Sequence, residues 1–106
     1  MYWYHQYIKV IRKPLSFDWD DGNINKNYVK HLVTTNMAEE SFKDKNLLTF
    51  PDPSHSLKEK RYHLIGKTYN NDLLFISYTI RKNKIRIISA RIADKKERKF
   101  YENQKT

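Results

Sequence analysis

One stretch of the chain decides the fold: Ile85-Arg86-Ile87-Ile88-Ser89-Ala90-Arg91-Ile92-Ala93-Asp94-Lys95-Lys96-Glu97-Arg98-Lys99-Phe100-Tyr101. Its first six residues are β-branched, small or Arg, a composition typical of a pleated and partly buried strand. From Ala93 onward the residues are helix formers, and the spacing of the apolar positions changes. The stretch therefore predicts a strand that runs directly into a helix, with the change of structure near Arg91.

The residues before this stretch predict an antiparallel meander of strands separated by turns. Residues 73–80 are almost continuously apolar, so we expect a central strand in which both Phe75 and Ile76 are buried. Residues 61–66 alternate between the two faces of a sheet, which is typical of a half-buried strand. Residues 47–50 predict a further strand, and the prolines that follow end it.

Two helices are expected on the N-terminal side of this sheet. A short alternating strand over residues 15–20 leads through turn-forming residues into a first helix over residues 24–31. Residues 34–36 offer an N-cap for a second helix that ends near Asp44. Glu39 stands three residues after the last of these N-cap candidates, which is the spacing of a capping box.

The length of 106 residues suits one domain with a single modest core. We divide the chain into an N-terminal extension, residues 1–14, and a single domain, residues 15–106. The expected fold class is α+β: a small antiparallel sheet with two N-terminal helices and a C-terminal helix packed on it.

Composition limits the classes of partner. Lys and Arg number 21 against 12 Asp and Glu, and the formal net charge of +9 favours an acidic partner such as a nucleic acid or an acidic protein. The chain has no Cys, which excludes disulfides and thiolate metal sites and allows a reducing compartment. No apolar run approaches the length of a membrane span. We therefore expect a cytoplasmic protein that does not engage a membrane.

A series of short motifs, in this order, resembles the BrnT toxin family: Phe17-x-Trp19-Asp20, Asn27-x-x-Lys30-His31, Asp52-Pro53-Ser54-His55, Arg61, Ile65-Gly66, Tyr78-Thr79-x-Arg81 and Ile85-Arg86-Ile87-Ile88-Ser89-Ala90-Arg91-x-Ala93-x-x-x-Glu97-Arg98-x-x-Tyr101. The resemblance runs from Phe17 to Glu102, and the last block is nearly complete. It implies a RelE-like ribonuclease toxin of a type II toxin–antitoxin system, which a BrnA-type antitoxin neutralises by tight binding. RNA is then the substrate.

Two positions depart from the family pattern. Leu32 follows His31 where the family usually has Gly, and Asn23 stands where a Lys is common before the first helix. Both departures concern local geometry.

Metal-independent RNA cleavage needs a group that accepts the proton of the 2′-hydroxyl, an acid for the leaving oxygen, and cations for the charge on phosphorus. For these tasks we select Arg81, Arg86, Arg91, Glu97 and Tyr101 as catalytic candidates. We expect further contacts to RNA from Lys30, His31, His55, Arg61, Lys95 and Arg98. Four His without Cys, and without a His-x-x-x-His pair, favour neither a metal site nor metal-dependent hydrolysis. No small-molecule cofactor is expected.

Less specific interpretations stay open at this point. Arg86 or Arg91 can form a salt bridge with Asp94 or Glu97, and Tyr101 can be a core aromatic. His63 is expected to be structural or to face solvent. The same charge also fits a non-enzymatic nucleic-acid-binding or interaction module, whose aromatic residues would stack bases.

Overall fold

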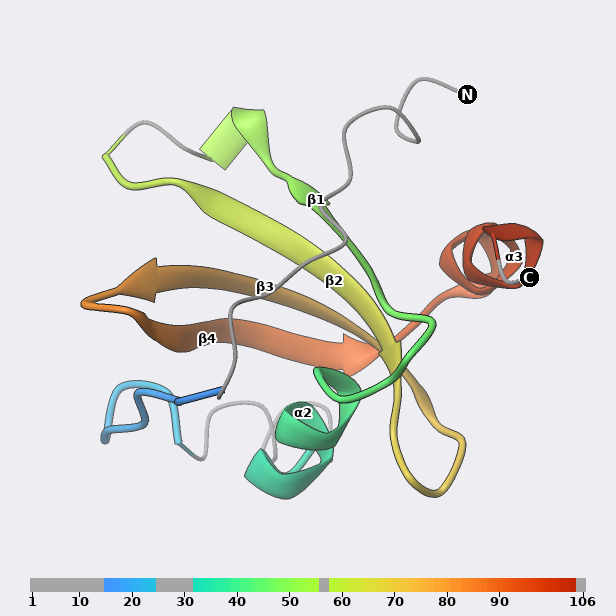
Figure 1. The fold of residues 1–106 in the computed structure, drawn as a ribbon, viewed down its shortest axis with the longest axis horizontal. Coiled ribbons are helices and arrows are strands. Elements are labelled where there is room, and N and C mark those ends of the chain that lie inside the picture. Colours follow the sequence, from blue (N-terminus) through green and yellow to red (C-terminus); the bar gives the residue numbers. More distant parts are fainter. Residues whose placement is uncertain (1–14, 25–31, 56–57, 105–106) are drawn as a thin grey trace.

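The computed structural model describes residues 15–24, 32–55 and 58–104 (Figure 1). Four strands form one antiparallel sheet in chain order: β1 (Leu48–Pro51), β2 (Arg61–Lys67), β3 (Leu73–Arg81) and β4 (Lys84–Ile92). A 3-10 turn, η2 (Pro53–His55), follows β1, and the two helices of the described residues are α2 (Thr35–Ser41) and α3 (Lys95–Gln104). Neither α2 nor α3 is long and apolar enough to cross a membrane.

This architecture confirms the α+β class, the antiparallel meander and the strand that runs into a C-terminal helix. The expected first helix, apart from Ile24, and the N-terminal extension, residues 1–14, lie outside the described residues. The count of three helices and the RelE-like layout therefore stay predictions.

Apolar side chains cover the sheet on both faces, but not to the same extent. On one face the C-cap residue of α2 is Phe42, whose ring meets Tyr78 edge-on at 5.1 Å between centroids. On the other face α3 contributes Tyr101, which packs with Ile65 and Leu73. Because α3 stands at the end of the sheet where β4 stops, the described residues cover the rest of that face less (Figure 1).

Because the two faces are covered unequally, two neighbouring residues of β3 differ in burial. Ile76 points to the α2 face and is fully buried, as predicted. Phe75 points to the α3 face and is only partly buried, so the prediction that both are buried is wrong for Phe75. A partly exposed aromatic ring is thereby left in the middle of the sheet.

Gly66 fixes how closely α2 approaches the sheet. A Cβ at this position would collide with the backbone carbonyl oxygen of Ser41, the last residue of α2. Glycine is required here because backbone meets backbone, and the close contact brings Phe42 over the centre of the sheet.

The expected strand over residues 15–20 is reduced to one parallel bridge beside β4. Ile85 donates its N–H to Ser16 O and accepts from Asp18 N, both at 2.8 Å. The turn that follows is fixed by Asn23, whose buried side-chain amide donates to Ile87 O at 3.0 Å. Its Oδ1 accepts from Asp20 N at 2.8 Å, which a Lys could not do. The Asn at position 23, where the family commonly has Lys, therefore stabilises this turn.

The N-cap of α2 is Thr34, whose hydroxyl accepts a hydrogen bond from Met37 N at 3.1 Å. Glu39 does not close the capping box that its spacing suggested. Its carboxylate accepts from Trp19 Nε1 at 2.7 Å and so ties the N-terminal segment to α2.

The backbone conformation at Leu32 explains why glycine is preferred at this position of the family pattern. Its φ of 58° lies in the left-handed region, and its side chain is 69% exposed. A left-handed conformation costs an ordinary residue roughly 1–2 kcal/mol, and glycine escapes this cost but loses more entropy on folding. We expect Leu32→Gly to raise the free energy of unfolding by up to ~1 kcal/mol in urea denaturation.

Leu32→Ala is the matched control, because it removes the same exposed side chain but keeps the Cβ that causes the strain. It should leave stability nearly unchanged. A Leu32→Gly protein no more stable than Leu32→Ala would contradict the strain at this residue.

Candidate active site

Three strands bring polar side chains together around the ring of Phe75. The His63 ring on β2 lies 4.8 Å from the Phe75 ring, measured between centroids. The guanidinium carbon of Arg91 on β4 lies 4.5 Å from the centroid of the same ring. The strand register explains the grouping, because Arg91 pairs with Phe75 and His63 pairs with Ser77. An imidazole and a guanidinium thus flank one aromatic ring on the less covered face.

His63 is held between a carboxylate and a hydroxyl. Its Nε2 lies 3.1 Å from Asp52 Oδ2, and its Nδ1 lies 3.0 Å from Ser77 Oγ. Burial lowers the pKa of His63 from 6.5, although the Asp52 charge acts in the opposite direction. An ionised Asp52 can only accept, so Nε2 carries the proton and Nδ1 accepts from Ser77. His63 is therefore a neutral base with its lone pair directed at Ser77.

Asp52 is a buried carboxylate with several donors around it. Burial acts to raise its pKa, but hydrogen bonding from Ser54 and the neighbouring histidines lower it overall. His55 Nδ1 lies 2.9 Å from Asp52 Oδ2, because η2 turns the chain back on itself. In the described part of the chain, no three His, Cys, Asp or Glu side chains are arranged to hold a metal ion.

Arg91 is fixed by the start of α3. Its two terminal nitrogens donate to the two carboxylate oxygens of Glu97, each at 2.8 Å. Glu97 Oε1 also accepts from Asp94 N at 2.9 Å, and Asp94 Oδ1 accepts from Glu97 N at 2.8 Å, which makes a capping box. The Glu97 hydrogen bonds raise the pKa of Arg91, so the guanidinium stays charged.

The hydrogen-bond pattern of Arg91 leaves donors for a ligand. A guanidinium has five N–H groups, and Glu97 takes two of them. A third, on Nη1, donates to the Ile92 carbonyl at 3.3 Å. Among the described residues, no acceptor takes the Nε–H or the second Nη2–H, and these two N–H groups point in the direction that suits two oxygens of one phosphate.

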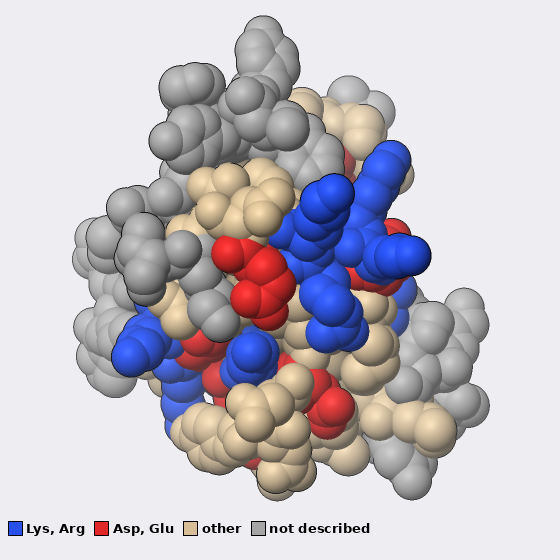
Figure 2. Space-filling view, turned by 90° about the vertical axis from the view of Figure 1, so that its right-hand side faces the viewer, with Lys and Arg blue, Asp and Glu red and all other residues tan. Residues whose placement is uncertain are grey.

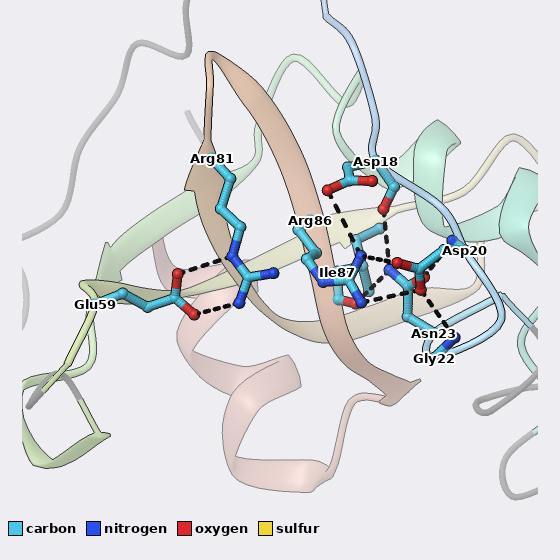
Figure 3. Close-up of polar contacts among 8 residues, drawn as sticks. All are labelled: Asp18, Asp20, Gly22, Asn23, Glu59, Arg81, Arg86 and Ile87. Carbon is cyan, nitrogen blue, oxygen red and sulfur yellow. Dashed lines mark hydrogen bonds and ion pairs between the residues drawn. The ribbon is translucent and has the colours of Figure 1, made fainter.

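Arg81 and Arg86 do not join Arg91, contrary to the sequence-based expectation. Arg86 donates to both carboxylate oxygens of Asp20 at 3.0 Å, and Arg81 donates to Glu59 at 3.0 and 2.9 Å (Figure 3). Asp18 adds a third carboxylate, 3.5 Å from Arg86. Two guanidinium groups thus face three carboxylates, an environment that disfavours a phosphate.

The distance along β4 separates the two sets of Arg. Arg86 precedes Arg91 by five residues, which corresponds to about 16 Å along a strand. In a regular strand this odd spacing would also put them on opposite faces. The register shifts between Ser77 and Tyr78, so that one extra residue on β4 restores the same face. They share a face of the sheet but not a site.

Tyr101 is a core residue and not part of the site. It is 1% exposed, and its hydroxyl donates to Asp44 Oδ2 at 2.6 Å. Burial raises its pKa further from neutrality. We therefore withdraw it as a catalytic candidate.

The expected RNA-binding residues have different positions. His55 reaches the site through Asp52, and Arg61 is partly buried at the start of β2. Lys95 and Arg98 are exposed on α3, on a side of the molecule where Lys and Arg side chains gather (Figure 2). Lys30 and His31 lie outside the described residues.

Sequence reasoning missed three of the residues that define the site: Asp52, His63 and Ser77. Alternation along residues 61–66 did place His63 opposite Tyr62 and Leu64, on the other face of the sheet. Nothing in the sequence gave the register that pairs it with Ser77. That register is a property of the folded sheet.

The fold and the site define a small, basic α+β protein that presents a neutral imidazole and a charged guanidinium side by side, groups that suit cleavage of a phosphodiester. A family model described as "Ribonuclease toxin, BrnT, of type II toxin-antitoxin system" matches residues 19–97, about three quarters of the chain. The chain belongs to this family. A search of curated proteins found no match.

Family membership confirms the resemblance seen in the sequence. The protein is a ribonuclease toxin of a type II toxin–antitoxin system, with RNA as its target and an antitoxin as its partner. The non-enzymatic binding module is therefore set aside.

The lowered pKa of His63 makes folding stability depend on pH. The folded state binds this proton more weakly than the unfolded chain, whose His titrates near 6.5. The contribution is therefore fully present above about pH 6.5 and is lost as the pH falls through the lower folded pKa. We expect the unfolding free energy of the wild type to fall more steeply with acid in this range than that of His63→Gln. Urea denaturation at a series of pH values measures this, and parallel curves would contradict it.

Proposed function

We propose that this toxin cleaves RNA without a metal ion, at the sheet face around Phe75. One observation carries the proposal: His63, held between Asp52 and Ser77, faces the same aromatic ring as Arg91. A proton acceptor and a phosphate-binding cation are then available within one patch, on a face that α3 leaves partly exposed.

His63 is the proton acceptor in this proposal. The ribose 2′-hydroxyl donates to Ser77 Oγ, which is partly exposed. As the 2′-oxygen attacks phosphorus, its proton passes to Ser77 Oγ while the Ser77 hydroxyl proton passes to His63 Nδ1. The resulting imidazolium is stabilised by Asp52, which holds Nε2 throughout. Asp52 is thus a positioning residue that also fixes the tautomer of His63.

Arg91 stabilises the negative charge that builds on the phosphate oxygens. Its guanidinium is immobilised by Glu97 and by the Phe75 ring, so it requires no rearrangement when that charge develops. Glu97 acts as a positioning residue for Arg91. We assign protonation of the leaving oxygen to His55, the second imidazole on Asp52.

Cleavage assays with single variants test these assignments. His63→Ala and Arg91→Ala should each lower the cleavage rate of an RNA oligonucleotide by on the order of 10² or more, the usual scale for losing a general base or a preorganised cation. Circular dichroism should show a retained fold. Activity should persist in EDTA.

Arg81→Ala is the matched control, since it removes an Arg of the same sheet whose partner is Glu59. It should keep near wild-type cleavage. A folded His63→Ala or Arg91→Ala protein with full activity would remove that residue from the site, and loss of activity in EDTA would refute the metal-independent mechanism.

A BrnA-type protein is the antitoxin that we propose, acting by covering the basic side of the toxin. The formal net charge of +9 favours a partner that brings acidic groups. Electrostatic steering predicts that association slows as salt rises, while the complex, once formed, persists. Stopped-flow binding with a BrnA-type protein measures this. If that protein is not captured by the toxin at low salt, the assignment fails.

A further inference from the structure

The first half of α3 carries an unusual concentration of exposed cations. Four of the five residues from 95 to 99 are basic and exposed: Lys95, Lys96, Arg98 and Lys99. We call these four the α3 basic surface. It belongs to the side of the molecule on which blue side chains gather (Figure 2). None of these four side chains takes part in an ion pair between described residues.

The acidic residues nearby have other partners. Glu97 gives both oxygens to Arg91, and Asp94 Oδ1 accepts from Glu97 N in the capping box. Glu102 follows in the second half of the same helix. The two acids at the start of α3 thus bind Arg91 and the helix backbone. They do not neutralise the α3 basic surface.

This charge placement is unfavourable for the helix itself. Backbone dipoles make the first turn of a helix partly positive, so Lys and Arg there lower helix stability while Lys and Arg in the last turn raise it. In α3, Lys95 and Lys96 stand in the first turn beside the acidic Glu97, and the last turn has no basic residue. Neither intrahelical pairing nor the dipole accounts for the cations, whereas a polyanionic ligand would.

We propose that the α3 basic surface binds the RNA chain that flanks the scissile phosphate. The inference rests on the proposed cleavage site, because it assumes that the scissile phosphate is bound by Arg91. Glu97 joins Arg91 to the first turn of α3, so Lys95, Lys96 and Arg98 lie within one helical turn of a residue that touches the site. A strand of phosphates that meets Arg91 passes directly onto these cations.

The surface acts on binding and not on the chemical step. Phosphate contacts of this kind are independent of sequence and release counterions, so the affinity falls with salt in proportion to the number of contacts. For single strands the slope of log K against log salt is about −0.7 per contact. Each cation removed from the surface should reduce the slope by about this amount.

Binding is measured with a 2′-O-methyl RNA oligonucleotide, which lacks the attacking 2′-hydroxyl and so stays intact, and the reference is the wild-type protein. Two double variants are compared with it: Lys95→Gln with Lys96→Gln, and Arg98→Gln with Lys99→Gln. Each should bind RNA more weakly and reduce the magnitude of the salt slope by about 1.4. The melting temperature of the Lys95→Gln, Lys96→Gln protein should stay the same or rise, because its cations oppose the helix dipole.

Lys82→Gln with Lys84→Gln is the matched control, since both residues are exposed at the β3–β4 turn, far along the sheet from α3. It removes the same charge and should leave the salt slope unchanged. Unchanged slopes in both α3 variants, or an equal reduction in the control, would overturn the proposal.

Two further outcomes distinguish this proposal from the active-site proposal and from the antitoxin proposal. If His63→Ala and Arg91→Ala cleave normally but the α3 variants change the slope, the active-site proposal fails and the α3 basic surface stands. If the α3 variants lose capture of the antitoxin while the RNA slope is unchanged, the surface serves the antitoxin and the RNA proposal is overturned.

Discussion

The carboxylate of Glu97 is the interaction on which the site depends. It binds Arg91 with both oxygens and also closes the capping box with Asp94. One side chain therefore helps to cap the start of α3 and holds the guanidinium over Phe75. Because helix start and cation position share this group, the fold of the C-terminal stretch and the geometry of the site cannot vary independently.

The protein uses arginine in two opposite ways on one sheet face. At one end, Arg81 and Arg86 are matched by carboxylates from segments far away in sequence, and Arg86 fastens the N-terminal segment to β4. At the other end, Arg91 has a single carboxylate partner, Glu97, among the described residues. Residue type alone does not separate these functions. The local balance of charge does, because Arg81 and Arg86 together face three carboxylates, Glu59, Asp20 and Asp18.

The sequence predicted the elements better than the site, for a physical reason. Strand periodicity and turn residues are local, so the meander and the burial of Ile76 could be predicted. Whether Phe75 is covered depends on where α3 lands, and the partner of Arg86 is 66 residues away. Such contacts depend on tertiary packing and register, which no local pattern contains.

Several local features of this chain reduce its stability, and two of them, Asp52 and His63, lie in the candidate site. Asp52 is a buried carboxylate, and His63 is desolvated enough to lower its pKa. Burial of charged groups costs free energy unless they are hydrogen-bonded, and here each cost is offset by a partner that also orients the group. The strained backbone at Leu32 has no such compensation in the site, and it stands at the entry to α2. The burial of Asp52 and His63 costs stability but orients a reactive group, which indicates function. The strain at Leu32 orients no such group, so a substitution can remove it without affecting the site.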